Sequence, residues 1–167
     1  MTPVDAQEFR HALGRFPSGV TVVTVRGRES AADAAARDYG MTVSAFASLS
    51  LHPPLVLVCI GDDATIAGAV AEAGHFAVNV LSETQESLAQ RFAEKDADRF
   101  DGAKLSRGMH DLALLDGAVA TLQCAVVARH RGGDHTIVVG EVLAAAAVED
   151  GRPLVYQRGE YRRLNSG

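Results

Sequence analysis

The segment from Gly40 to Ile60 constrains this chain most, because small side chains and hydroxyls run directly into a Pro-Pro break and an apolar strand. A strand built only to pack on a core would carry Val, Ile and Phe throughout, whereas small residues let a planar or backbone group approach closely. The pattern indicates either a ligand-facing strand or a tight strand beside a barrel corner. The small residues concerned are Thr42, Ser44, Ala45, Ala47, Ser48 and Ser50.

Length and composition predict one soluble domain spanning residues 1–167, large enough to bury its own core. The net charge of −5 and the lack of a basic stripe argue against a nucleic-acid surface. No apolar leader follows Met1, and no apolar run reaches the ~20 residues that a membrane span needs. Cys59 and Cys124 both lie in apolar runs, as free thiols do in a reducing compartment. We therefore expect a cytoplasmic protein.

Hydrophobic periodicity and turn signals predict a mainly β chain with a few short helices. The helices are expected from an Asp5 cap to Pro17, over 65–73, and from a Ser82–Gln85 capping box to about Ala93. Residues 26–39 are interpreted as a long mobile hairpin loop, and 94–112 as irregular. Strands are expected at 19–25, 41–48, 55–60, 75–81, 119–130, 136–148, 153–156 and 161–164. Such locally connected strands favour a closed or nearly closed antiparallel barrel.

Several common kinds of site are absent from the sequence. No GxGxxG motif follows a strand, and neither a GxSxG elbow nor a GxxxxGK[ST] loop occurs. The six histidines form no HExxH motif and no Cys/His pair at zinc spacing, so we expect no metal site.

A flavin needs donors along its pyrimidine edge, a flat slot, and a positive or N–H-rich end for the phosphate. Residues 42–49 could provide the donors and the slot, and a helix start near Thr65 together with Arg91 could provide the phosphate end. His135 follows a Gly-Gly-Asp turn in which Asp134 could orient the imidazole toward a carboxamide or pyrophosphate. A lone His at such a hairpin can equally be a plain turn or surface residue.

The chain resembles the flavin reductase-like domain family, the short-chain NAD(P)H:flavin reductases that serve two-component monooxygenases. The resemblance covers roughly Phe9 to Leu164. It rests on five segments in order: FRHALGRFPSGVTVVTV, GMTVSAFASLSLHPPLVLVCI, HFAVNVLSETQESLAQRFA, GDHTIVVGEV and PLVYQRGEYRRL.

The resemblance implies an FMN-binding split β-barrel, antiparallel and Greek-key-like, that forms a homodimer with flavin in clefts near the subunit interface. It also implies that His135 meets the nicotinamide nucleotide and that Tyr161 closes the pocket. Cys59 and Ile60 would lie beneath the flavin, and Arg91, Phe92 and Ala93 would reach the ribityl phosphate. The residues implied to line the flavin are Thr42, Val43, Ser44, Ala45, Phe46, Ser48 and Leu49.

The chain departs from the family pattern in places. Many relatives read TANSF where this chain has Thr42-Val-Ser-Ala-Phe46, which leaves backbone contacts to the ring but fewer polar side chains. The turn after Ile60 carries Asp62 and Asp63 where basic or serine residues are often found. Two carboxylates near a phosphate are unfavourable unless they point away.

The sequence therefore predicts an NAD(P)H-dependent flavin reductase that passes hydride from NADH or NADPH to FMN or FAD and supplies a partner monooxygenase. His135 would position the nicotinamide nucleotide rather than accept a proton. Alternatives are an FMN-binding electron carrier or sensor of the same fold, a pyridoxamine-phosphate-oxidase-like enzyme, and a purely structural dimer module.

Overall fold

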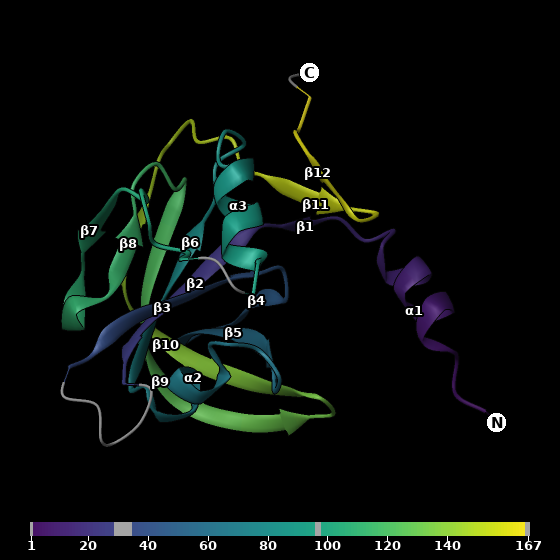
Figure 1. Ribbon diagram of the computed structural model, residues 1–167, viewed down its shortest axis with the longest axis horizontal. Helices are drawn as coiled ribbons and strands as arrows, with labels where there is room; N and C mark the ends of the chain where they lie inside the picture. The colour runs from purple at the N-terminus through teal and green to yellow at the C-terminus, as the bar shows by residue number, and fades with distance from the viewer. Residues whose placement is uncertain (1, 29–34, 96–97, 166–167) are drawn as a thin grey trace.

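The computed structural model describes residues 2–28, 35–95 and 98–165, and it is mainly β with few helices, as predicted (Figure 1). Its elements are, in chain order, α1 (Ala6–Leu13), β1 (Ser18–Gly19), β2 (Thr21–Gly27), β3 (Arg37–Val43), β4 (Phe46–Leu51), β5 (Pro54–Gly61), α2 (Ala67–Glu72), β6 (His75–Val80), α3 (Glu86–Ala93), β7 (Leu105–Arg107), the 3₁₀ turn η1 (Met109–Asp111), β8 (Ala113–Leu115), β9 (Ala120–Gly132), β10 (His135–Ala147), β11 (Val155–Gln157) and β12 (Glu160–Arg162).

Seven strands form one antiparallel sheet in the order β3-β2-β6-β9-β10-β5-β4. β9 and β10 make the long hairpin that the sequence predicted. β3 and β4 follow each other in the chain but lie at opposite edges of the ladder, and no pairing joins them in the described residues. The antiparallel character is confirmed, whereas the hydrogen-bonded ladder is open rather than closed.

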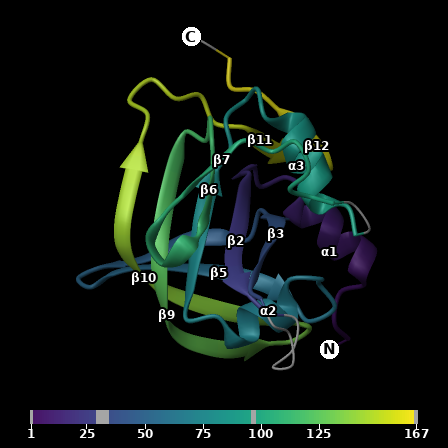
Figure 2. The same ribbon diagram turned by 60° about the vertical axis from the view of Figure 1, so that its left-hand side comes forward.

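Strand β2 is buried on both faces, and it separates two core clusters. Val23 and Val25 pack in the first cluster, beneath α2, and Val22 packs in the second, beneath α3. Figures 1 and 2 show these two helices at different ends of the sheet. The second cluster brings α3 against β3 through Phe92, which meets Phe100 edge to face at 5.0 Å between ring centroids.

Gly40 of β3 makes room for this pair of aromatic rings. A Cβ built at Gly40 would lie 2.6 Å from the Phe92 ring and 3.0 Å from the Phe100 ring. Real Cβ atoms do not approach so closely, so the position requires glycine.

Helix α1 is capped by Asp5, whose carboxylate accepts hydrogen bonds from the amides of Gln7 and Glu8, as predicted. None of its residues is buried, and Figure 1 shows it standing to one side of the sheet. Its apolar side chains therefore lack a covering surface within the described part of the chain.

The predicted irregular segment 94–112 instead contains β7 and η1, and β7 pairs with β8 in a small hairpin. Its tip is held by two unusual features. His110 and Asp111 both adopt left-handed backbone (φ 52° and 60°), and the His110 ring stacks on His75 at 3.5 Å between centroids. Arg107 adds a bidentate pair with Asp38 of β3 at 2.8 Å.

The predicted loop 26–39 is shorter than expected, because β2 extends to Gly27 and β3 begins at Arg37; residues 29–34 of that loop lie outside the described residues. In the predicted capping box, Gln85 Oε1 accepts from the Ser82 amide at 3.0 Å, while the Ser82 hydroxyl bonds to Thr84. In the described residues we find no helix with the length and apolar character required to cross a membrane.

Candidate functional site

Part of the segment from Gly40 to Ile60 lines a cavity of about 630 Å³, here called the slot. Ser44, Ala45, Phe46 and Ala47 form one side of it, Leu57 and Cys59 of β5 form the floor, and Phe9, Leu13, Phe16 and Tyr156 form the other side. Cavities of this size accommodate small-molecule ligands.

Strand alternation decides which residues face the slot. Along β5 the even-numbered residues Val56, Val58 and Ile60 are buried in the core, so Leu57, Cys59 and Gly61 share the opposite face. Directly paired residues of antiparallel strands lie on the same face, which adds Ala47 opposite Leu57 and Ile137 opposite Cys59. The floor is thus a patch of small and medium side chains at the junction of three strands.

Two backbone amides at the rim of the slot make no hydrogen bond within the described residues. β3 ends at Val43 and β4 begins at Phe46, so Ser44 and Ala45 belong to no strand ladder. The Ala45 carbonyl accepts from the Cys59 amide at 2.9 Å, but within the described residues the amides of Ser44 and Ala45 have no acceptor. Both residues are exposed, so these donors are available to the edge of a planar ring.

His135 lies two residues along from Ile137 on the same face, about 7 Å further along the strand. It pairs with Gly61, and a Cβ at Gly61 would lie 3.7 Å from His135 Nε2 and 3.2 Å from an Asp63 carboxylate oxygen. A cavity of about 550 Å³, the His135 cavity, is lined here by Gly61, Asp62, Asp63, Arg131, Gly133, Asp134 and His135.

The Asp134 carboxylate holds the imidazole at 2.7 Å between Oδ1 and Nδ1. The hydrogen bond from His135 lowers the pKa of the Asp134 carboxyl, so this residue stays ionised and fixes the ring. Nε2 is thereby left pointing away from Asp134, as the sequence analysis expected for an oriented imidazole.

The β5–α2 turn leads from the His135 cavity to a third cavity of about 630 Å³, the Thr65 cavity, lined by Thr65, Gly68, Lys95 and Arg99 among others. The two carboxylates of the turn are both engaged: Asp63 lies 3.6 Å from Lys95, and Asp62 accepts from the Thr136 hydroxyl at 3.1 Å. Lys95 therefore offsets part of the charge of Asp63, while the Asp62 carboxylate is held by a neutral hydroxyl.

Other predicted site residues have structural positions instead. Val43, Ile60 and Phe92 are buried in the core, and the Thr42 hydroxyl donates to the Ala89 carbonyl of α3 at 2.6 Å. Arg91 donates to the Asp101 carbonyl and Ala93 is exposed at the end of α3; neither lines the slot.

Ser48 and Leu49 also lie away from the slot floor. Ser48 pairs with Val56, on the core side of the sheet, and the register shifts between Ser48 and Ser50, which places Leu49 in a bulge. Because side chains alternate between the two faces of a strand, the residues 42–49 predicted to line the flavin do not all face the slot.

Tyr161 packs against the second core cluster, where burial raises the pKa of its hydroxyl, and its strand partner Tyr156 lines the slot in its place. Sequence reasoning also missed Leu57, Gly61 and Lys95 as lining residues. Only alternation along the apolar strand 54–61 could have indicated the first two, and Lys95 carried no signal beyond its charge.

The chain is similar over most of its length to known proteins. The family model described as "Flavin reductase like domain" matches residues 13–165. The chain is 41% identical over 162 residues to "Actinorhodin polyketide dimerase" of Streptomyces coelicolor, covering 97% of this chain and 88% of the relative. It is 42% identical over 164 residues to the reductase component of 4-nitrophenol 4-monooxygenase/4-nitrocatechol 2-monooxygenase of Rhodococcus opacus, covering 96% and 82%.

Among solved structures, the Streptomyces globisporus C-1027 NADH:FAD oxidoreductase SgcE6, in complex with NAD and FAD fragments, superimposes with a TM-score of 0.87 at 39% sequence identity. The match covers 99% of this chain and 98% of that one.

Proposed function

Because this chain belongs to the flavin reductase like domain family, we propose that it reduces free FMN or FAD with NADH or NADPH and hands the reduced flavin to a flavin-dependent monooxygenase. The names of two relatives support the proposal: one is an NADH:FAD oxidoreductase, and another is the reductase component of a monooxygenase.

The observation that carries the proposal is the pair of free amides at Ser44 and Ala45, set beside a floor of small side chains. The pyrimidine edge of a flavin presents acceptors, and exposed backbone N–H groups supply matching donors. The small side chains of Ala47 and Cys59 leave room for a flat ring. This room is on the same face of the sheet as His135, which pairs with Gly61, two residues after Cys59 on β5.

The residues present fit a flavin with its phosphate end at the Thr65 cavity. The bound flavin and nicotinamide supply the hydride chemistry themselves. Ser44 and Ala45 would orient the ring, and Gly61 would let the ribityl chain pass beneath His135. Lys95 and Thr65 would meet the phosphate, a role that the sequence analysis gave to Arg91 and Thr65. His135 would position the nicotinamide nucleotide, so the contribution of the protein is orientation.

We further propose that the chain is a single domain, a split barrel, and that it works as a homodimer. β2 contributes to both core clusters, which ties the two halves of residues 1–167 together. The exposed fractions of Phe9, Leu13 and Phe16 are 53%, 58% and 79%, and all three line the slot. A second copy covering this apolar face would also close the slot over its ligand.

Steady-state oxidation of NADH with added FMN or FAD tests the activity. We expect turnover with substrate flavin in large excess over protein, together with loss of flavin on dialysis. A protein that stays yellow through extended dialysis and does not turn over NADH would instead be an electron carrier or sensor.

A further inference from the structure

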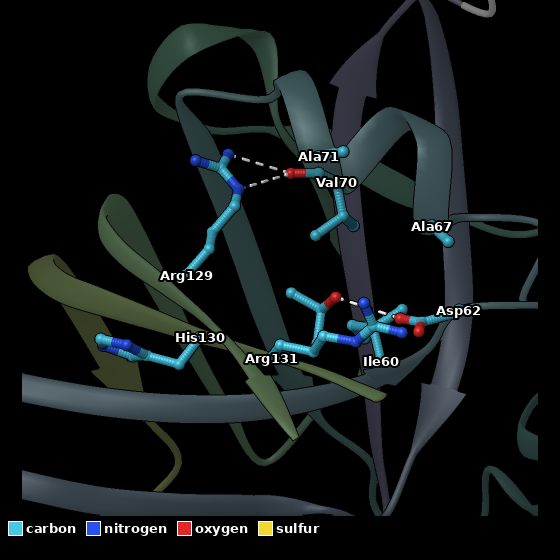
Figure 3. A pocket seen from close by; sticks show the side chains of 9 residues that line it. Ile60, Asp62, Ala67, Val70, Ala71, Arg129, His130 and Arg131 are labelled. Carbon is cyan, nitrogen blue, oxygen red and sulfur yellow. Dashed lines mark hydrogen bonds between the residues drawn. The ribbon is translucent and has the colours of Figure 1, made fainter. Parts of the chain in front are cut away.

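We propose that a second site, separate from the slot, binds a small aromatic carboxylate. The site is a cavity of about 470 Å³ between α2 and the β9–β10 hairpin, here called the Arg129 cavity (Figure 3). The proposed reductase function does not place a ligand in it, although Asp62 and Arg131 also line the neighbouring His135 cavity.

The cavity lies on the opposite face of the sheet from the slot. Its lining includes Ile60 and Thr136, which pair with each other, whereas Cys59 and His135 on the neighbouring positions face the slot side. A ligand in the Arg129 cavity is therefore separated from the slot by the thickness of the sheet.

One wall of the cavity is apolar. Ile60, Ala67, Val70 and Ala71 line it from β5 and α2. Ala71 is exposed, while Ile60 and Val70 are anchored in the first core cluster, so the wall is preformed. A volume of about 470 Å³ suits a ligand with a single ring.

The other wall is cationic. Arg129 and Arg131 are two residues apart on β9 and project from the same face, and Figure 3 shows Arg129 reaching Val70 of α2 while Arg131 extends toward Asp62. Arg129 donates through Nε and Nη2 to the Val70 carbonyl at 3.2 and 3.0 Å, and Nη2 also donates to the Ala73 carbonyl at 2.5 Å. These bonds satisfy two carbonyls at the C-terminal end of α2. The negative end of the helix thus does not oppose an anion here.

The Arg131 side chain has no hydrogen bond or ion pair within the described residues, although it lines the cavity beside Asp62. Asp62 is itself engaged by the Thr136 hydroxyl. Two guanidinium groups and one carboxylate therefore line the cavity, and an anionic ligand would balance the charge. A guanidinium binds a carboxylate through two parallel hydrogen bonds, and the apolar wall would receive the ring.

Calorimetric titration of the flavin-free protein with benzoate tests the site directly, with benzamide as the neutral counterpart. We expect benzoate to bind at least about tenfold more tightly than benzamide, because a charged hydrogen-bonded pair is lost with the amide. The readout is binding and not turnover, so its result does not depend on the reductase activity.

Two variants locate the binding. Ala71→Phe fills the cavity from an exposed position on α2 and should abolish benzoate binding, and Arg131→Gln should weaken it at least about tenfold. Arg163→Gln, an exposed arginine near the C-terminus, is the matched control and should bind as wild type. Saturating FMN should leave benzoate binding unchanged.

Any of four results would overturn the proposal: no benzoate binding, equal binding of benzamide, retention of binding in both folded variants, or displacement of benzoate by FMN. Thermal denaturation of each variant establishes that it is folded before the titration.

Discussion

At the scale of single residues, His135 is the clearest test of how the nucleotide is positioned. Replacement of His135 by Ala should raise KM for NADH while leaving flavin affinity nearly unchanged, because the imidazole lies over Gly61 and away from the free amides of Ser44 and Ala45. Loss of one hydrogen bond to a polar or charged group should lower kcat/KM by about 1.5–3 kcal/mol.

Steady-state kinetics measure this effect, and His52→Ala serves as control, since His52 is exposed and lines none of the cavities described above. A His135→Ala enzyme that loses flavin but keeps its KM for NADH would show that the role assigned to His135 is wrong.

The floor of the slot can be tested by a pair of neighbouring substitutions. Ala47→Leu should weaken flavin binding at least about tenfold by occupying ring space, whereas Ser48→Leu should bind flavin as wild type because its side chain lies on the other face. Both residues are exposed, so both variants should melt close to wild type. Equal flavin affinity in the two variants, measured by fluorescence titration, would exclude the slot as the ring site.

The sequence predicted those parts of the site that depend on short local patterns, and not those that depend on pairing between distant strands. Small residues at 44–47 and the Gly-Asp-His turn are local patterns, and the structure brings Ser44, Ala45, Phe46 and Cys59 together, with His135 on the same face. The sequence also predicted Ser48 and Ile60 as flavin contacts, and the structure places both on the other face of the sheet. Which face a residue takes depends on register with β4 and β10, which no single segment encodes.

At the scale of elements, α3 docks on β3 only because Gly40 leaves space for two aromatic rings. Gly40→Ala should therefore destabilise the protein by about 1–3 kcal/mol, since its Cβ would overlap Phe92. Gly68→Ala, within α2 and with nothing within 4 Å of its added Cβ, is the matched control and should stabilise by about 0.5–1 kcal/mol. Urea denaturation measures both, and equal stability of the two variants would contradict the packing argument.

The long elements were predictable and the short ones were not. The β9–β10 hairpin has extended apolar strands around a Gly-Gly turn, and α1 has its Asp5 cap. β7 and β8 are only three residues each, and β8 is held in place by distant partners: the Thr24 hydroxyl donates to the Ala113 carbonyl, and the Leu115 amide donates to the Asn79 side chain. Local propensity carries no information about such anchors.

At the scale of the whole molecule, the exposed apolar face around α1 predicts a dimer. Light scattering after gel filtration should give twice the chain mass, and Phe16→Lys should shift the protein toward monomer, because a buried charge would oppose association. Leu143→Lys, at another exposed apolar residue, on β10, is the control and should remain dimeric. A wild-type monomer would contradict the interface.

The same assembly should hold its flavin loosely. Lys95 and Arg99 both line the Thr65 cavity, but Lys95 is shared with Asp63 and Arg99 donates to the Glu94 and Gly40 carbonyls. With so little charge pairing, a dissociation constant in the micromolar range, about −8 kcal/mol, is expected, and equilibrium dialysis measures it. Nanomolar retention would argue for a resident prosthetic group.

The open ladder was the feature of the whole fold that local patterns could not predict. Each strand pair follows from alternation and turn chemistry, but whether β3 and β4 meet depends on the twist and stagger accumulated across seven strands.

The stack of His110 on His75 makes the attachment of the β7–β8 hairpin to β6 dependent on pH. Burial, and secondly the neighbouring His110, lowers the pKa of His75 below its ordinary value of 6.5. The unfolded chain therefore binds this proton more readily, so the stabilisation is complete above pH 6.5 and is lost as pH falls through the folded pKa. The protection factors of the β8 amides, which correct for the intrinsic pH dependence of exchange, should fall below pH 6.5, and His75→Phe, which keeps a ring but no charge, should reduce that fall. Acid would thus loosen one corner of the protein before the rest of the sheet.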